Sequence, residues 1–490
     1  MALPNADVTA DSFKRANQLK ARAAENTARA YGTSRLLEPE EITAAGLHSP
    51  TLPILAGRSP DGRLIRYGGD GHILTLAPSG AGKSTALAVP NLLSYPGSVV
   101  CLDPKGSLAA MTARQRLAMG QKVILLDPFK AVQGEALDKI RRSFNPLSTL
   151  DVDSPLLLDE IRLISSSLVI GEEGRNRYFS DSARVILELI ILYVLAALDE
   201  DYWTLKTVVS YAYKSPERFK ALVLDQCEDS GAFGGLLAQL ANQVAGFQGE
   251  GGTSIWSSLL RSLNFLMSPL IAAALEPSDV DFRAIKERPT TVYLTLPATR
   301  LSTYGRFLRL MLSQILNSVY DSREPEHPVL FLLDEAASLD RLEIIEDGVA
   351  LMRGFHLKLW LLFQDLSQLK SIYAQRWPTF VANSGLRQVF SVNDLDTADY
   401  VSRLMGNGTI EVLNESIQPL SAGAAGTVGV VSRPVLTPDE VARLPGDELL
   451  LLYDRMLPIR AKKMAYFDQR TDPEFAGLYD PDPYRSAKGR

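Results

Sequence analysis

The stretch Ala77-Pro78-Ser79-Gly80-Ala81-Gly82-Lys83-Ser84-Thr85 decides how the rest of the chain is interpreted. It follows the apolar run Ile73–Leu76 and precedes a helical pattern. Small residues let backbone N–H groups converge on a phosphate, while a lysine reaches the β and γ phosphates and a hydroxyl binds Mg²⁺. The N-terminus of the following helix adds partial positive charge. Although Ala77 stands where glycine is usual, we expect Ser79 to Thr85 to hold ATP, with Ser84 as a Mg²⁺ ligand.

A second acidic motif follows another apolar run. Val329–Leu333 ends in the adjacent acids Asp334 and Glu335. Asp334 would orient Mg²⁺, and Glu335 would polarise the attacking water as general base. A strand that merely ends in a solvated Asp-Glu pair is the alternative, and the presence of the phosphate motif disfavours it.

Phosphoryl transfer also needs a γ-phosphate contact and a cation for the developing charge. The run Leu357–Phe363 ends at Gln364, whose uncharged amide can contact the γ-phosphate or hold the water. Arg353 lies between this run and the acidic motif and could reach a nucleotide held by a neighbouring subunit. Arg387 and Arg403 are rivals for that role, and a structural arginine is the remaining alternative.

Two Asp-Pro pairs end other apolar runs. Asp103 and Lys105 follow Ser98–Leu102, and Asp127 follows Lys122–Leu126. Open α/β sheets bind ligands at the carboxyl ends of their strands. Because Asp-Pro also simply terminates strands, Asp103 and Lys105 are even candidates for the nucleotide site, and Asp127 is interpreted as a terminator. The histidines lack ligand spacing, so we expect no zinc site.

Apolar runs of strand length recur on both sides of a long helical interval. They are Ile73–Leu76, Ser98–Leu102, Lys122–Leu126, Thr291–Leu296, Pro328–Leu333, Leu357–Phe363 and Arg387–Val392. Continuous apolar runs are typical of strands covered on both faces. We therefore predict an α/β fold with a mostly parallel sheet, interrupted by an all-α insertion.

The chain divides into five predicted parts. They are a polar helical arm (1–35), the first part of a nucleotide-binding domain (36–149), the all-α insertion (150–284), the second part of the nucleotide-binding domain (285–467) and an irregular tail (468–490). The arm carries Arg15, Arg22 and Arg29 near one face, which predicts a solvated face or else a contact with a membrane surface or a partner. Leu36–Arg66 is rich in proline and is interpreted as a connecting arm with short elements.

Composition excludes several protein classes. The chain has 490 residues, 46 % hydrophobic residues, two cysteines and a net charge of −6. These values disfavour disorder and a disulfide scaffold and fit a reducing cytosol. The longest apolar stretch, Val185–Leu198, is shorter than the roughly 20 residues of a membrane span, so no transmembrane helix is expected. Net acidity disfavours a protein that coats DNA, but a basic channel inside a ring would leave the total unchanged.

In combination these motifs resemble the TraG-type coupling ATPases of type IV secretion systems. The resemblance spans Leu36 to Asp454 and rests on APSGAGKS, PNLLSYPGSVVCLDPKG, KVILLDPF, FLLDEAASL, LWLLFQDLSQLKSIY and RQVFSVNDLDTADYVSRLMG. It implies a RecA-like P-loop NTPase core carrying an all-α domain, assembled as a homo-hexameric ring. Such a ring would use ATP and Mg²⁺ to drive relaxase-bound DNA, or effector proteins, into the secretion channel.

The resemblance also assigns residues. It implies that Lys83 and Ser84 form the phosphate-loop pair, that Asp334 and Glu335 form the second motif, and that Gln364 is the third. Arg353 then stands where the family's trans-acting arginine is expected, and the inserted helices would recognise substrates.

Two departures qualify the resemblance. Family members usually carry N-terminal transmembrane helices, which we do not find here, so we expect a cytoplasmic protein recruited to the inner membrane by partners. Ser107 stands where an acidic residue is common.

Two other functions stay open. One is a cytosolic substrate receptor that uses nucleotide only as a switch. The other is a DNA translocase of the FtsK/HerA type, whose core motifs are similar. The DPKG and QDLSQL segments favour the coupling family over the translocase.

Overall fold

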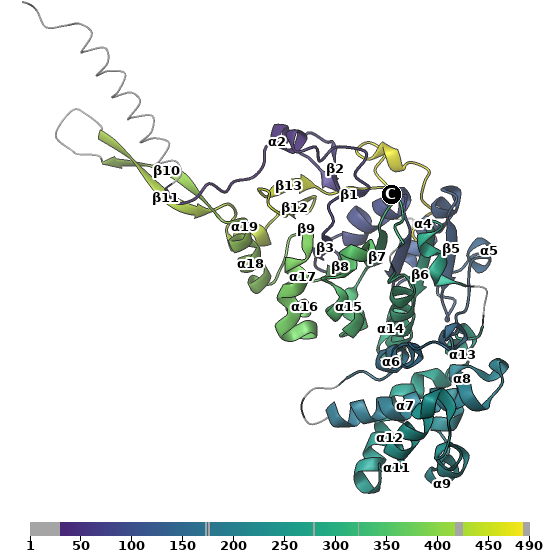
Figure 1. Cartoon of the computed structure of the whole chain (residues 1–490). Coiled ribbons are helices and arrows are strands. Elements are labelled where there is room, and N and C mark those ends of the chain that lie inside the picture. Colours follow the sequence, from purple (N-terminus) through teal and green to yellow (C-terminus); the bar gives the residue numbers. More distant parts are fainter. Residues whose placement is uncertain are drawn as a thin grey trace, which may run out of the picture.

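The computed structural model describes residues 30–171, 174, 177–277, 280–321, 323–416 and 425–483 (Figure 1). The three arginines of the predicted N-terminal arm lie outside these residues. The described chain forms one eleven-stranded sheet in the order β2-β1-β13-β12-β9-β3-β8-β7-β4-β6-β5, together with a separate hairpin, β10-β11.

The strands lie close to the predicted runs. Their bounds are β1 Ile54–Arg58, β2 Leu64–Tyr67, β3 His72–Leu76, β4 Val99–Asp103, β5 Lys122–Leu126, β6 Thr290–Thr295, β7 Val329–Leu333, β8 Leu357–Phe363, β9 Ser384–Val389, β10 Asn407–Ser416, β11 Ala425–Pro434, β12 Glu448–Tyr453 and β13 Ile459–Lys462. The block from β9 to β5 is parallel throughout. This confirms the predicted α/β fold with a mostly parallel sheet.

Four antiparallel strands extend the parallel block beyond β9. Two of them, β1 and β2, come from the segment interpreted as a connecting arm, and the other two, β12 and β13, lie near the C-terminus. The sheet is therefore wider than the seven predicted runs.

Alternate residues of each parallel strand enter different cores. In β7, Leu330 and Leu332 pack with α3 (Val89–Ser94) and α4 (Ser107–Ala118) on one face. Phe331 points to the other face, where α14 (Leu301–Ser318) lies. Because successive strand side chains point to opposite faces, helices on both sides require the continuous apolar runs seen in the sequence.

The described residues between β5 and β6 form helices and no strand of the sheet. The helices are α5 Glu135–Asp138, α6 Leu157–Leu168, α7 Arg177–Ala197, α8 Leu205–Ala212, α9 Pro216–Phe219, α10 Asp225–Cys227, α11 Leu236–Ala245, α12 Gly249–Leu263 and α13 Pro269–Ala274. Most of them gather beyond α6 at one end of the molecule (Figure 1). Gly249, Gly251 and Gly252 lie in the first turn of α12.

Six further helices of the described chain lie outside the insertion. They are α2 Pro39–Ala44, α15 Glu343–Gly348, α16 Leu366–Tyr373, α17 Trp377–Ala382, α18 Leu395–Met405 and α19 Pro438–Ala442. Among the described helices, none combines the length and the apolar character that crossing a bilayer requires.

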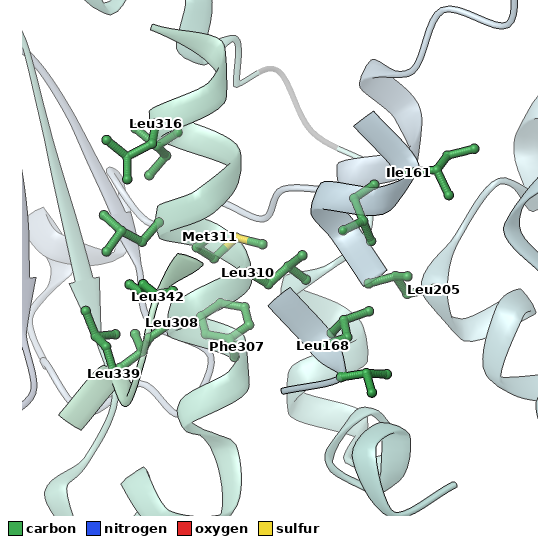
Figure 2. Close-up of a cluster of buried hydrophobic side chains, with 14 of the residues drawn as sticks. Ile161, Leu168, Leu205, Phe307, Leu308, Leu310, Met311, Leu316, Leu339 and Leu342 are labelled. Atoms are coloured by element: carbon green, nitrogen blue, oxygen red, sulfur yellow. The ribbon is translucent and has the colours of Figure 1, made fainter. Parts of the chain in front are cut away.

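Helix α14 joins the sheet to the inserted helices. Its side chains Phe307 and Leu308 belong to the same buried cluster as Leu339, which follows β7, and Ile161 of α6 (Figure 2). Because these side chains pack together, a shift of α14 would displace residues both after β7 and in the insertion.

Candidate nucleotide-binding site

The phosphate loop, residues 77–85, leaves the carboxyl end of β3. Gly80 and Gly82 have φ of 79° and 88°, a region that residues with a Cβ rarely adopt. The space where a Cβ would stand is open at both glycines. The loop is thus shaped so that backbone N–H groups can approach an anion closely.

The chain continues from this loop directly into a helix. Ser84–Ala88 form a wide turn of the π type, in which the Val89 N–H bonds to the Ser84 carbonyl. Helix α3 then runs to Ser94 and carries Pro90 in its first turn. The predicted order of strand, loop and helix is confirmed.

Strand order brings the three motifs to one edge of the sheet. Strand β8 lies between β3 and β7, with Leu76 aligned to Phe363 and Leu333 aligned to Leu361. Parallel strands end at the same edge, so the residues after β3, β7 and β8 emerge side by side. Lys83, Asp334 and Gln364 therefore meet although they are far apart in sequence.

The lysine and serine of the phosphate loop contact the two acids. Lys83 Nζ donates to Glu335 Oε2 at 2.9 Å and lies 3.7 Å from Asp334 Oδ1. Ser84 Oγ donates to Asp334 Oδ2 at 2.7 Å. One cation, Lys83, thus lies between two carboxylates, and each side chain is the type that the sequence predicted for its place.

Asp334 has the donor chemistry of a magnesium ligand. Burial raises the pKa of its carboxyl, and Lys83 and the Ser84 hydroxyl oppose that rise. Its buried Oδ1 has no hydrogen-bond partner among the described residues. Mg²⁺ prefers oxygen ligands from one or two carboxylates plus phosphates, so this oxygen beside the Ser84 hydroxyl fits the ion.

Glu335 is held in an unusual backbone conformation. Its φ is 72° and ψ 53°, in the left-handed region that costs a non-glycine residue of order 1 kcal/mol. Gln364 Nε2 donates to its Oε1 at 2.8 Å. The predicted base and the predicted amide are thus direct neighbours, and the same carboxylate also contacts Lys83.

Asp103 accepts a hydrogen bond from the first turn of α4. Its Oδ2 accepts the Ala109 N–H at 2.8 Å, and the side chain is only 1 % exposed. Burial and nearby Asp334 raise the pKa of Asp103 to about 7, although backbone N–H groups partly oppose this. Lys105 lies close enough to lower the pKa of Asp334. Both residues border the site.

Asp127 ends its strand, as predicted. Its carboxylate accepts the N–H groups of Ala131 and Val132 at 3.0 Å and pairs with Arg141. These contacts fold the chain back after β5 and leave the carboxylate 2 % exposed.

Arg353 lies at the opposite edge of the sheet from Lys83. It precedes β8 and lines a cavity of about 470 Å³ together with Gly71 and Ser384, which precede or begin β3 and β9. A seven-residue strand separates the two edges by roughly 20 Å. The exposed Arg353 therefore cannot reach the phosphate loop of its own chain.

The rival arginines have partners of their own. Arg387 donates to the Val381 carbonyl, and Arg403 pairs with Asp399 on the surface of α18. No hydrogen bond or ion pair joins the Arg353 side chain to another residue of the described chain.

Lys463 was missed by the sequence reasoning. It follows β13, and its Nζ donates to the Ala81 carbonyl and to the Gly446 carbonyl, each at 2.9 Å. The ammonium also lies 4.2 Å from the centre of the Phe390 ring, and burial lowers its pKa. No local motif marks this lysine, because its partner lies 382 positions away in the chain.

The sequence matches a known protein family and several of its members. The model of the family described as "Type IV secretory system Conjugative DNA transfer" matches residues 28–483. Protein VirD4 of Agrobacterium fabrum is 26 % identical over 472 residues, which cover 90 % of this chain and 66 % of the relative. Conjugal transfer protein TraG of Escherichia coli is 27 % identical over 464 residues, which cover 85 % of this chain and 71 % of the relative. The chain thus spans about two thirds of these relatives' length.

Solved structures agree on the fold. The bacterial conjugative coupling protein TrwBdeltaN70, in its unbound monoclinic form, has a TM-score of 0.67 at 16 % identity and covers 88 % of this chain and 92 % of its own. TrwB in complex with the ATP analogue ADPNP has a TM-score of 0.66 at 15 % identity, with coverages of 88 % and 93 %. A match over 28–483 spans all the motifs, and the TraG-type resemblance is confirmed. The chain belongs to the family of type IV secretory system conjugative DNA transfer proteins.

Proposed function

We propose that this chain is an ATP-hydrolysing coupling protein that drives DNA, protein substrates or both into a type IV secretion channel. The network of Lys83, Ser84, Asp334, Glu335 and Gln364 carries this proposal, because it unites a phosphate loop, a magnesium ligand and a general base at one sheet edge. Family membership supplies the transport process that hydrolysis would power.

ATP binding would rearrange the contacts of Lys83. The phosphates would lie against the N–H groups of residues 79–85, and the γ-phosphate would compete with Glu335 for the lysine ammonium. Ser84 and Asp334 would hold Mg²⁺, which when bound neutralises charge on the β and γ phosphates. The pair of Lys83 and Glu335 would therefore open as ATP binds, which would release the carboxylate.

Hydrolysis then depends on Glu335 and its neighbour. The released carboxylate would accept a proton from the attacking water, and the Gln364 amide would hold that water or sense the γ-phosphate. Arg353 of an adjacent copy would stabilise the transition-state charge, because the Arg353 of the same chain faces the other edge. Turnover would consequently depend on assembly.

A closed ring of identical subunits would bring Arg353 of each copy to the ATP site of its neighbour. A head-to-tail contact that closes places the arginine edge of one copy against the phosphate-loop edge of the next, and we propose a homo-hexamer. DNA would pass through the centre by phosphate contacts that ignore sequence, so its affinity should fall as salt rises. The helices of residues 150–284 would recognise a relaxase or effector, and channel partners would recruit the ring to the inner membrane.

The proposal is tested by ATP hydrolysis measured with and without single-stranded and duplex DNA, combined with transfer assays of Glu335→Gln. Loss of both hydrolysis and transfer supports a motor. Transfer that persists without hydrolysis would favour the receptor that uses nucleotide as a switch. DNA movement without dependence on secretion components would favour a translocase of the FtsK/HerA type.

A further inference from the structure

A second pocket lies beside the loop that follows Glu335. It encloses about 290 Å³ between the start of α14 and residues 337–340. Arg306, Arg309, Ser302, Thr303 and Ser338 line it. Two guanidinium groups and three hydroxyls thus converge on a space outside the phosphate loop.

Several hydrogen-bond donors of this pocket have no acceptor within the described chain. Arg309 is 3 % exposed, and its Nη1 donates to the carbonyls of Leu339 and Arg341 at 2.5 and 2.7 Å, but its Nε has no hydrogen-bond partner. The buried Nε of Arg306 and the buried Oγ of Ser338 also lack partners. A buried donor without a partner is destabilising, and more so when it is charged. A ligand that brings hydrogen-bond acceptors to this cluster would therefore be stabilised there.

The local charge favours an anion. Asp340 is the one acidic side chain that lines the pocket within the described part of the chain, and it is exposed. Arg261 adds a further positive charge near Arg306. Arginine forks and hydroxyls together match a tetrahedral oxyanion, which offers more acceptor positions than a carboxylate does.

We propose that this pocket binds a phosphate group, either a phosphodiester of a nucleic-acid backbone or a free inorganic phosphate. The site is separate from the phosphate loop, and its binding step does not depend on the proposed function.

The pocket is mechanically linked to the catalytic carboxylate. The Ser338 N–H donates to the Glu335 carbonyl at 2.9 Å, so one residue both lines the pocket and holds the backbone of Glu335. Arg309 holds the same loop at Leu339. The loop is bounded by Glu335 and Asp340, which both have positive φ. A phosphate that draws on Ser338 and Arg309 would therefore bias a strained loop, and this regulatory part does rest on the proposed function.

Arg306→Gln is the most direct probe, because Arg306 makes no hydrogen bond or ion pair to the described chain. Arg306→Lys keeps the charge, and Arg443→Gln removes an arginine whose side chain is 81 % exposed elsewhere. Thermal unfolding of each variant without ligand shows whether it folds. Binding of a fluorescein-labelled oligothymidine, without nucleotide, is followed by anisotropy across a salt series. Inorganic phosphate is tested by thermal shift at constant ionic strength in a Lys83→Ala background, which removes the phosphate loop as a competitor.

For a backbone phosphate, Arg306→Gln should bind oligothymidine about 10-fold more weakly and flatten the slope of log affinity against log salt by about 0.7, whereas Arg443→Gln should not. For free phosphate, the thermal shift should vanish in Arg306→Gln while oligothymidine binding stays unchanged. Arg306→Lys should retain part of either effect. If folded Arg306→Gln matches the parent protein in both arms, the proposal is wrong. No arm measures hydrolysis, so this failure would leave the proposed function standing.

Discussion

The Nζ atom of Lys83 lies 2.9 Å from Oε2 of Glu335, so the lysine that would bind the γ-phosphate is paired with the carboxylate that would activate water. The two side chains are 12 % and 31 % exposed, and a pair at this depth is only moderately stable. In the proposed mechanism ATP would displace the carboxylate from Lys83. The contact would then couple substrate binding to the release of Glu335.

Glu335→Gln should retain ATP binding and lose turnover by roughly 10²- to 10⁴-fold, because glutamine keeps the shape of the side chain but cannot accept the proton. Affinity measured by calorimetry and hydrolysis measured at saturating ATP separate the two effects. Glu326→Gln, at a side chain that is 93 % exposed, is the control and should match the parent protein. Equal turnover in the two variants would remove Glu335 from the mechanism.

Gln364→Ala should lower kcat by about 10²-fold with little change in KM, since the amide contacts Glu335 rather than the bare phosphate loop. Steady-state hydrolysis as a function of ATP concentration checks this. Gln248→Ala, at an exposed glutamine of the inserted helices, serves as the control. A large rise in KM at unchanged kcat would instead make Gln364 a residue for binding alone.

Lys463→Met should weaken ATP binding by about 10-fold, because the ammonium holds the carbonyl of Ala81 in place. The neighbouring Lys462 offers a matched control, since it pairs with Asp447 and Glu448 instead of the phosphate loop. Lys462→Met should bind ATP normally. An equal effect of both substitutions would point to general destabilisation of the C-terminal strands.

Asp103 should make stability depend on pH. Burial raises its pKa to about 7 in the folded protein, above the value of about 3.9 in the unfolded chain. The folded state therefore binds the extra proton, so stability is highest below about pH 4 and falls as pH rises towards about 7. Asp103→Asn removes the titrating carboxyl and with it this pH dependence of stability, while the amide oxygen can still accept the Ala109 N–H.

Urea unfolding at several pH values tests this prediction. Relative to the parent protein, Asp103→Asn should become more stable by up to roughly 1.4 kcal/mol per pH unit between about pH 4 and 7, and should level off above that. Asp153→Asn, at an exposed aspartate, should show no such trend. A pH-independent difference for Asp103→Asn would mean that its carboxyl is ionised throughout.

Short sequence patterns predicted the strands whose burial on both faces leaves a continuous apolar run. Strands β5 and β8 have the predicted bounds, because helices cover both faces and impose continuous apolar runs. Strands β1 and β2 were not predicted, since short strands among prolines and glycines look like a connecting arm. The two strands pair with each other, and β1 joins the sheet through β13, which is contributed by the other end of the chain.

Some residues of the candidate site could likewise be predicted from the sequence, and others could not. The types of Lys83, Ser84, Asp334 and Gln364 follow from strand ends and phosphate chemistry, and the structure brings them together. Lys463 could not be found, because its contact with the phosphate loop is set by tertiary structure alone. The sequence placed Arg353 between two strands but could not tell which sheet edge it would occupy.

In the proposed ring, each ATP site is shared between neighbouring copies. Arg353→Ala and Glu335→Gln should each be inactive alone, because every site in either ring lacks one residue. Mixing the two proteins, with time for subunits to exchange, should restore part of the DNA-stimulated hydrolysis, since some sites then combine Glu335 from one copy with Arg353 from the next. Activity of Arg353→Ala alone, or no recovery in a mixture shown to form joint rings, would contradict the account.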